Sequence, residues 1–106
     1  MKCFMLFTGS GPLVILTSYD SATDDDLLEK LRTKGIEKFL AYEIPIPLAE
    51  ERYGAHFAAV RRDLHQEDDL RVLDYNGDRA FRLFHFHELA VPVTYELQPQ
   101  EAAKQA

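Results

Sequence analysis

The sequence has a single cysteine, Cys3, and this scarcity sets the first limits on the protein. One cysteine cannot form an intrachain disulfide, whereas secreted domains of this size usually depend on several. We therefore expect a reducing, cytoplasmic location. Cys3 lies in an apolar, strand-like run, and free cysteines are among the most buried residues. This favours a core residue over a catalytic nucleophile.

Long apolar runs are also missing. The stretch from Cys3 to Leu16 is apolar but is interrupted by Gly-Ser-Gly-Pro at residues 9–12. It therefore lacks the continuous run of about 18 or more apolar residues that predicts a membrane span. Lys2 is the only basic residue before it, and no small-x-small cleavage site follows it. We expect neither a membrane span nor a signal peptide.

Positive charge is in short supply as well. The 12 Lys and Arg residues are outnumbered by 18 Asp and Glu residues, which gives a formal net charge of −6. Binding to nucleic acid or to an anionic membrane surface depends on Lys and Arg, which neutralise phosphates. We therefore expect neither nucleic acid nor a membrane as a partner.

What the sequence does contain is a series of short strand-like runs. Hydrophobic residues make up 46% of the 106 residues, which suits one packed domain. Lys2–Thr8 and Leu13–Ser18 flank the Gly-Ser-Gly-Pro turn and predict a β-hairpin. Both runs are apolar on both faces, which predicts central strands or strands at an oligomer interface.

The clearest helix signal covers Thr23–Lys34. Thr23 is the expected N-cap, three aspartates follow where the helix dipole favours negative charge, and Leu27, Leu28 and Leu31 form an apolar stripe. A short second helix is expected over Pro47–Tyr53. The segment His56–Leu64 fits either a continuation of that helix or a strand, and Gly54 before it favours a strand.

A second hairpin is predicted near the C-terminus. Leu70–Tyr75 and Arg79–Phe86 flank Asn76-Gly77, the strongest short-range hairpin signal. Ile36–Ile44 and Val93–Leu97 predict two more strands. The expected fold class is α+β, with a mostly antiparallel (or mixed) sheet built from hairpins, one main helix and one short helix. We expect a single domain over residues 1–97 and a disordered tail over residues 98–106.

The second hairpin supplies a candidate ligand site. A two-residue turn places Arg71 directly opposite Arg82, and opposed like charges are unfavourable unless something neutralises them. An anionic ligand held by Arg71, Arg82 and Tyr75 would do so, because paired guanidinium groups suit carboxylates and phosphates. Acidic neighbours are the simpler explanation, and the candidates are Asp63, Glu67 and Asp69.

A candidate metal site comes from His85 and His87, which lie on the same side of the predicted strand. A third ligand would come from His56, Glu88 or Cys3, but the spacing fixes none of them. The simpler explanation is structural, with His85 on the core face bonded to a backbone carbonyl and His87 at the strand end. Zinc motifs have stricter spacing than this pair.

The chain also resembles a family of small bacterial cytosolic proteins of unknown function. The residues that carry the resemblance are KCFMLFTGSGPLVILTS at the start, ERYGAHF in the middle, and RDL followed by DDLRVLDYNGDRAFRLF. They frame nearly the whole chain up to about Glu96. The resemblance implies a bacterial, cytosolic α+β protein, and it brings no catalytic residue or cofactor with it.

Three functions follow from these patterns, in order of preference. The first is a protein-interaction or homo-oligomeric accessory module without catalysis, because exposed apolar strand surface of this extent marks an interface. The second is a small anionic-ligand binder that uses Arg71 and Arg82. The third is a metal-assisted enzyme that uses His85 and His87. The sequence identifies no cofactor.

Overall fold

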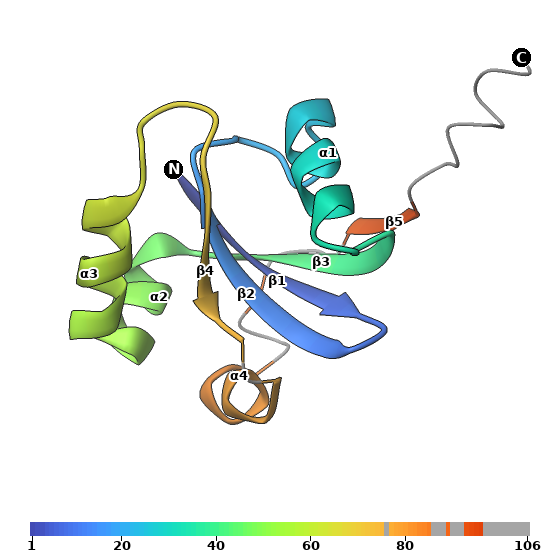
Figure 1. Ribbon diagram of the computed structural model, residues 1–106. Helices are drawn as coiled ribbons and strands as arrows, with labels where there is room; N and C mark the ends of the chain where they lie inside the picture. The colour runs from blue at the N-terminus through green and yellow to red at the C-terminus, as the bar shows by residue number, and fades with distance from the viewer. Residues whose placement is uncertain (76, 86–88, 90–92, 97–106) are drawn as a thin grey trace, which may run out of the picture.

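The chain folds around a five-stranded antiparallel sheet that has helices on both faces (Figure 1). The computed structural model describes residues 1–75, 77–85, 89 and 93–96. The strand order is β4-β2-β1-β3-β5. The strands are β1 (Lys2–Thr8), β2 (Gly11–Thr17), β3 (Lys38–Ile44), β4 (Leu70–Asp74) and β5 (Val93–Glu96), and the helices are α1 (Asp25–Thr33), α2 (Ile46–Tyr53), α3 (Ala55–Asp63) and α4 (Gly77–Leu83). The predicted α+β class with an antiparallel sheet is confirmed.

The first hairpin forms the centre of the sheet, as one of the two alternatives for it predicted. β1 pairs with β2 in a register that sets Phe4 opposite Ile15, and each strand has a second neighbour, β3 and β4 respectively. Successive side chains point to opposite faces, so Cys3 and Met5 face one side while Phe4 and Leu6 face the other. All four are buried. The sheet therefore has two apolar faces, and each needs its own cover.

Helix α1 covers one of these faces. Its buried stripe packs on Phe4, Leu6 and Ile15 to form what we call the α1-side core, whose helical members are Leu27, Leu28 and Leu31. The predicted cap is wrong by one residue. Asp24 caps the helix by accepting a hydrogen bond from the Asp26 amide at 2.9 Å, while the Thr23 amide and hydroxyl are engaged with Ser21.

The other face is covered by α2, α3 and α4, which form the α2-side core. Tyr53, Phe57 and Phe84 pack there on the central strands. The strand predicted over His56–Leu64 is wrong, because that segment is α3. Gly54 adopts a positive φ of 56°, a conformation open to glycine, so the chain changes direction and begins a new helix at once. Phe57 and Val60, three residues apart, then face the core together.

The second predicted hairpin is also wrong. Within the described residues, β4 pairs with β2 rather than with residues 79–85, and Gly77–Leu83 forms α4. The physical reason is burial: Ala80 and Phe84, four residues apart, both fill the α2-side core, and helical spacing brings them to the same side. Burial of these two side chains outweighs the turn preference of the two residues Asn76-Gly77. Asn76 lies outside the described residues.

Two further predictions concern the chain ends and the helix count. β5 lies at the sheet edge beside β3, where the sequence places a strand, whereas the tail expected over 98–106 lies outside the described residues. The described residues contain four helices instead of the two expected. None of these helices has the length and hydropathy needed to cross a bilayer.

Asp69 ties the start of β4 to the loop after β2. Its carboxylate accepts hydrogen bonds from the amides of His65 and Leu70, at 2.8 Å each, and pairs with Arg71 Nε at 3.1 Å. Its backbone carbonyl accepts from Thr17 Oγ1 at 2.8 Å, and its amide donates to Ser18 Oγ at 2.8 Å. One residue thus joins two loops that lie far apart in sequence.

We predict that Gly77→Ala destabilises the protein by about 1–3 kcal/mol, because a methyl group there would lie 2.6 Å from the rigid Pro12 ring. Chemical denaturation gives the free energy of unfolding. Gly9→Ala is the matched control, since nothing lies within 4 Å of its added carbon, and it should change stability by less than about 0.5 kcal/mol. Equal effects of the two variants would contradict the close packing of α4 on β2.

We predict that Asp69→Ala lowers the unfolding free energy by about 1.5–3 kcal/mol at neutral pH. Partial burial raises the pKa of Asp69, but the hydrogen bonds from His65, Leu70 and Arg71 outweigh it and hold the pKa below its ordinary 3.8. Since the pKa is lowered in the folded state, this stabilisation is present above pH 3.8 and is lost as pH falls through the folded value.

Denaturation of wild type and variant across pH tests this prediction. The difference between them should be constant above about pH 5 and shrink in more acidic solution. Glu67→Gln serves as control, because Glu67 is exposed and lies in the same loop. A gap between wild type and Asp69→Ala that is the same in acid as at neutral pH would show that the carboxylate charge contributes nothing.

Candidate functional site

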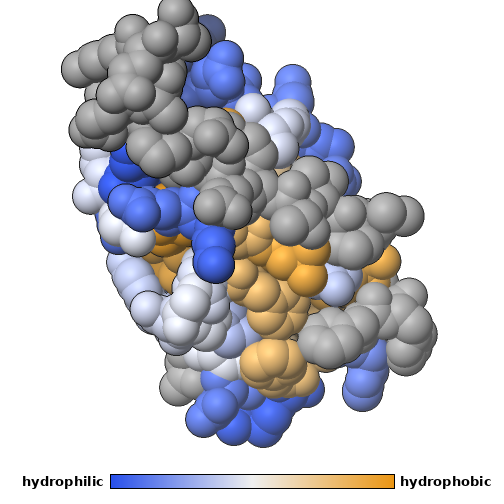
Figure 2. Space-filling view, turned by 90° about the vertical axis from the view of Figure 1, so that its right-hand side faces the viewer, coloured by the Kyte–Doolittle hydropathy of each residue, from blue (hydrophilic) through white to orange (hydrophobic). Residues whose placement is uncertain are grey.

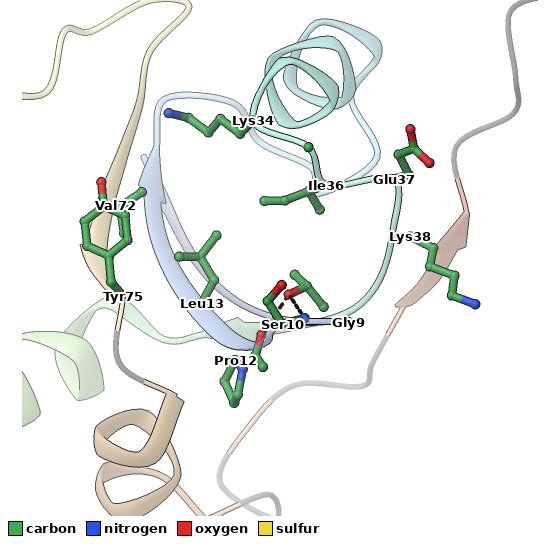
Figure 3. Close-up of a pocket in the computed structure, with 13 residues that line it drawn as sticks. Gly9, Ser10, Pro12, Leu13, Lys34, Ile36, Glu37, Lys38, Val72 and Tyr75 are labelled. Carbon is green, nitrogen blue, oxygen red and sulfur yellow. Dashed lines mark hydrogen bonds between the residues drawn. The ribbon is translucent and has the colours of Figure 1, made fainter.

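An open cleft of about 640 Å³ lies on the α1 face of the sheet (Figure 3). It is bounded by the turn between β1 and β2, by the segment from α1 to β3, and by the end of β4. The cleft exists because α1 has only nine residues and covers part of a face that five strands build. Cavities of this size are typical of small-molecule sites.

The floor of the cleft is apolar. It is lined by Leu13 of β2, Val72 of β4, and Ile36 from the segment between α1 and β3. Each of these side chains is partly buried against the α1-side core. Gly35 makes this possible: its positive φ of 83° turns the chain after α1, so that the Ile36 amide donates to the Leu31 carbonyl at 3.0 Å. The Ile36 side chain thereby returns toward the sheet, and Figure 3 shows it facing the space above Leu13.

The hairpin wall of the cleft is held by its own hydrogen bonds. Thr8 Oγ1 donates to the Gly11 carbonyl at 2.9 Å and accepts from the Ser10 amide at 3.1 Å. Gly11 has a φ of 109°, which a side chain would disfavour. The wall therefore has a defined shape and presents hydroxyl groups of Thr8 and Ser10 beside the apolar floor.

Four ionisable side chains line the rim: Lys34, Glu37, Lys38 and Tyr75. In Figure 3, Lys34 extends over the cleft toward β4, whereas Glu37 and Lys38 point away from it. Tyr75 follows β4 and is 80% exposed. Among the described residues, the side chains of Lys34 and Tyr75 make no hydrogen bond and no ion pair.

The structure separates the three residues of the predicted anion site. Tyr75 lines the cleft, Arg71 lies on β4, and Arg82 is exposed on α4, so the two arginines are not opposed across a hairpin. Arg71 is neutralised by Asp69, one of the acidic neighbours considered from the sequence. The strand register that suggested anion binding by Arg71 and Arg82 is therefore absent from the described residues.

His85, the first member of the predicted histidine pair, does not lie on a strand. His85 is exposed and follows α4, while His87 and Glu88 lie outside the described residues, so the metal site stays a prediction. His56 Nε2 donates to the Leu73 carbonyl at 2.6 Å. Within the described part of the chain, no three His, Cys, Asp or Glu side chains gather into a metal-binding group.

Two buried groups are structural. Cys3 is fully buried, and burial raises the pKa of its thiol to about 12, so the thiol is protonated at neutral pH. The Tyr53 hydroxyl donates to Asp74 Oδ2 at 2.8 Å inside the α2-side core. Burial, and then this bond, raise the pKa of Tyr53 well above its ordinary value. The bond fastens α2 to the end of β4.

A second apolar surface lies away from the cleft. The ring centroids of Phe7 and Phe81 are 5.3 Å apart, those of Phe7 and Tyr42 are 5.5 Å apart, and Phe81 is 48% exposed. Figure 2 views the right-hand side of Figure 1, where hydrophobic residues gather in the centre and hydrophilic residues lie below them. A protein contact at the Phe7–Tyr42–Phe81 surface stays a prediction.

Sequence reasoning missed most of the cleft. The sequence identifies Lys34 only as the end of a helix and Leu13 only as a strand residue. No local signal places Leu13, Ile36 and Val72 together, because they come from three separate elements.

Comparisons with protein-family models, curated proteins and solved structures found no match to the chain. The resemblance to bacterial cytosolic proteins stays a prediction.

Proposed function

We propose that this protein is a non-catalytic binding module whose cleft takes a small, largely apolar molecule. The observation that carries the proposal is the floor of Leu13, Ile36 and Val72, which remains partly open to solvent beside α1. Transfer of apolar surface out of water is favourable by about 25 cal/mol for each Å² buried. A preformed concave floor of this kind is the general form of small-molecule sites.

An interface role for the first hairpin has less support. That role was proposed because both faces of the hairpin are apolar, and in the folded chain its two faces are covered by α1 and by α2–α4. Among the described residues, Phe7, Tyr42 and Phe81 form another apolar group, in which Phe81 is 48% exposed. The cleft has a defined volume and an apolar floor, so the small-ligand function is the one we favour.

We predict that N-phenylnaphthylamine, an uncharged apolar fluorophore, binds the wild-type protein at one site. Leu13→Gln, which sets an amide in the cleft floor, should weaken binding by roughly tenfold or more, because the amide loses its water without gaining a partner. A fluorescence titration measures both affinities.

Leu40→Gln is the matched control. Leu40 is a partly buried strand leucine whose neighbours on β3 face α1, so strand alternation directs Leu40 to the opposite face. Its substitution should leave the affinity unchanged. Thermal unfolding of each variant checks that the fold persists. The proposal fails if the fluorophore does not bind wild type, or if Leu40→Gln weakens binding as much as Leu13→Gln does.

A further inference from the structure

We infer that Lys34 and Tyr75 form a head-group end of the cleft, and that its ligand is an apolar molecule with one anionic group. This inference rests on the proposed function and adds to it the charge and the orientation of the ligand. The group itself is a carboxylate, sulfonate or phosphate ester, since all three present acceptor oxygens with negative charge.

The direction of the rim side chains supports the anionic group. Lys34 is the rim cation that extends over the cleft, while Glu37 and Lys38 point away from it (Figure 3). Of the charged side chains that line the rim, Lys34 is therefore the one directed over the opening, although the whole chain has a formal net charge of −6. A cation beside an apolar, poorly hydrated floor attracts an anion more strongly than a cation in open water does.

The hydrogen-bonding inventory supports the same conclusion. The Lys34 ammonium has three N–H donors and the Tyr75 phenol has one O–H donor, and neither bonds to a described residue. Both polar ends lie toward the β4 side of the opening in Figure 3. Donors without acceptors on one side of the opening complement a group that offers several acceptor oxygens.

A purely structural role for Lys34 fits the geometry less well. A lysine at the end of a helix often turns back to the last carbonyl groups, where the helix dipole is negative. Here the backbone amide of Lys34 makes the capping bonds, to the carbonyls of Leu31 and Arg32. The side chain extends away from α1 and across the cleft (Figure 3).

The position of Tyr75 indicates how the ligand lies. An 80% exposed tyrosine ring at the margin of an apolar floor offers a flat apolar surface and a polar tip at once. The anionic group then sits between Lys34 and Tyr75, and the apolar body runs over Val72 and Leu13 toward Ile36. A single ammonium over the opening complements one anionic group.

A pair of fluorophores tests the inference. Anilinonaphthalene sulfonate has one sulfonate, and N-phenylnaphthylamine has the same ring system without it. We expect Lys34→Met to weaken sulfonate binding by about tenfold and Tyr75→Phe to weaken it by about threefold, while both variants bind the uncharged fluorophore as wild type does. Added salt should weaken sulfonate binding to wild type more than to Lys34→Met.

Lys38→Met is the matched control, since it removes a rim charge that points away from the cleft, and it should leave both affinities unchanged. The inference is overturned if Lys34→Met weakens both fluorophores equally, weakens neither, or acts no more strongly than Lys38→Met. The Leu13→Gln variant distinguishes this failure from a failure of the proposed function. If Leu13→Gln still weakens binding of the uncharged fluorophore, the proposal of an apolar cleft is retained. Loss of that dependence removes both.

Discussion

The structure depends on one constraint: the β1–β2 hairpin is apolar on both faces, and both must be removed from water. A single sheet cannot achieve this, so the chain places α1 on one face and α2–α4 on the other (Figure 1). The hairpin becomes the centre of the sheet, flanked by β3 and β4, and the helices cover its two faces. Burial of its side chains is the dominant favourable contribution to folding.

The helices cover the two faces of the sheet unequally, and the candidate site lies on the less covered face. Three helices serve the α2 side, whereas α1 alone serves the other and ends before it reaches the hairpin turn. The strand side chains of Leu13 and Val72 beyond its end are still apolar, because the sheet continues there. A cleft with an apolar floor is therefore a consequence of a short helix on a wide sheet, and the polar residues of the α1–β3 segment become its rim.

The sequence correctly predicted the elements whose signals are local. Its predictions were wrong where packing against residues distant in sequence determines the secondary structure. The first hairpin, α1 and α2 have their turn, capping and proline signals within a few residues. The predictions at Gly54 and Asn76-Gly77 were wrong because both signals are compatible with a turn between strands. Helices α3 and α4 form instead because their apolar side chains bury one face of the sheet. Tyr75 was identified as a ligand residue from a register that does not exist, and the floor residues meet only through the sheet order.

The strand β4 is fastened at both ends: the backbone of Asp69 bonds its start to Thr17 and Ser18, and the Asp74 carboxylate bonds its end to Tyr53 of α2. Its last side chains alternate between the layers, so Tyr75 emerges on a segment that is already restrained before any ligand arrives. Binding at such a wall forfeits little conformational entropy, and affinity then reflects the contacts themselves. A short, doubly anchored edge strand thus makes one wall of the cleft a preorganised surface.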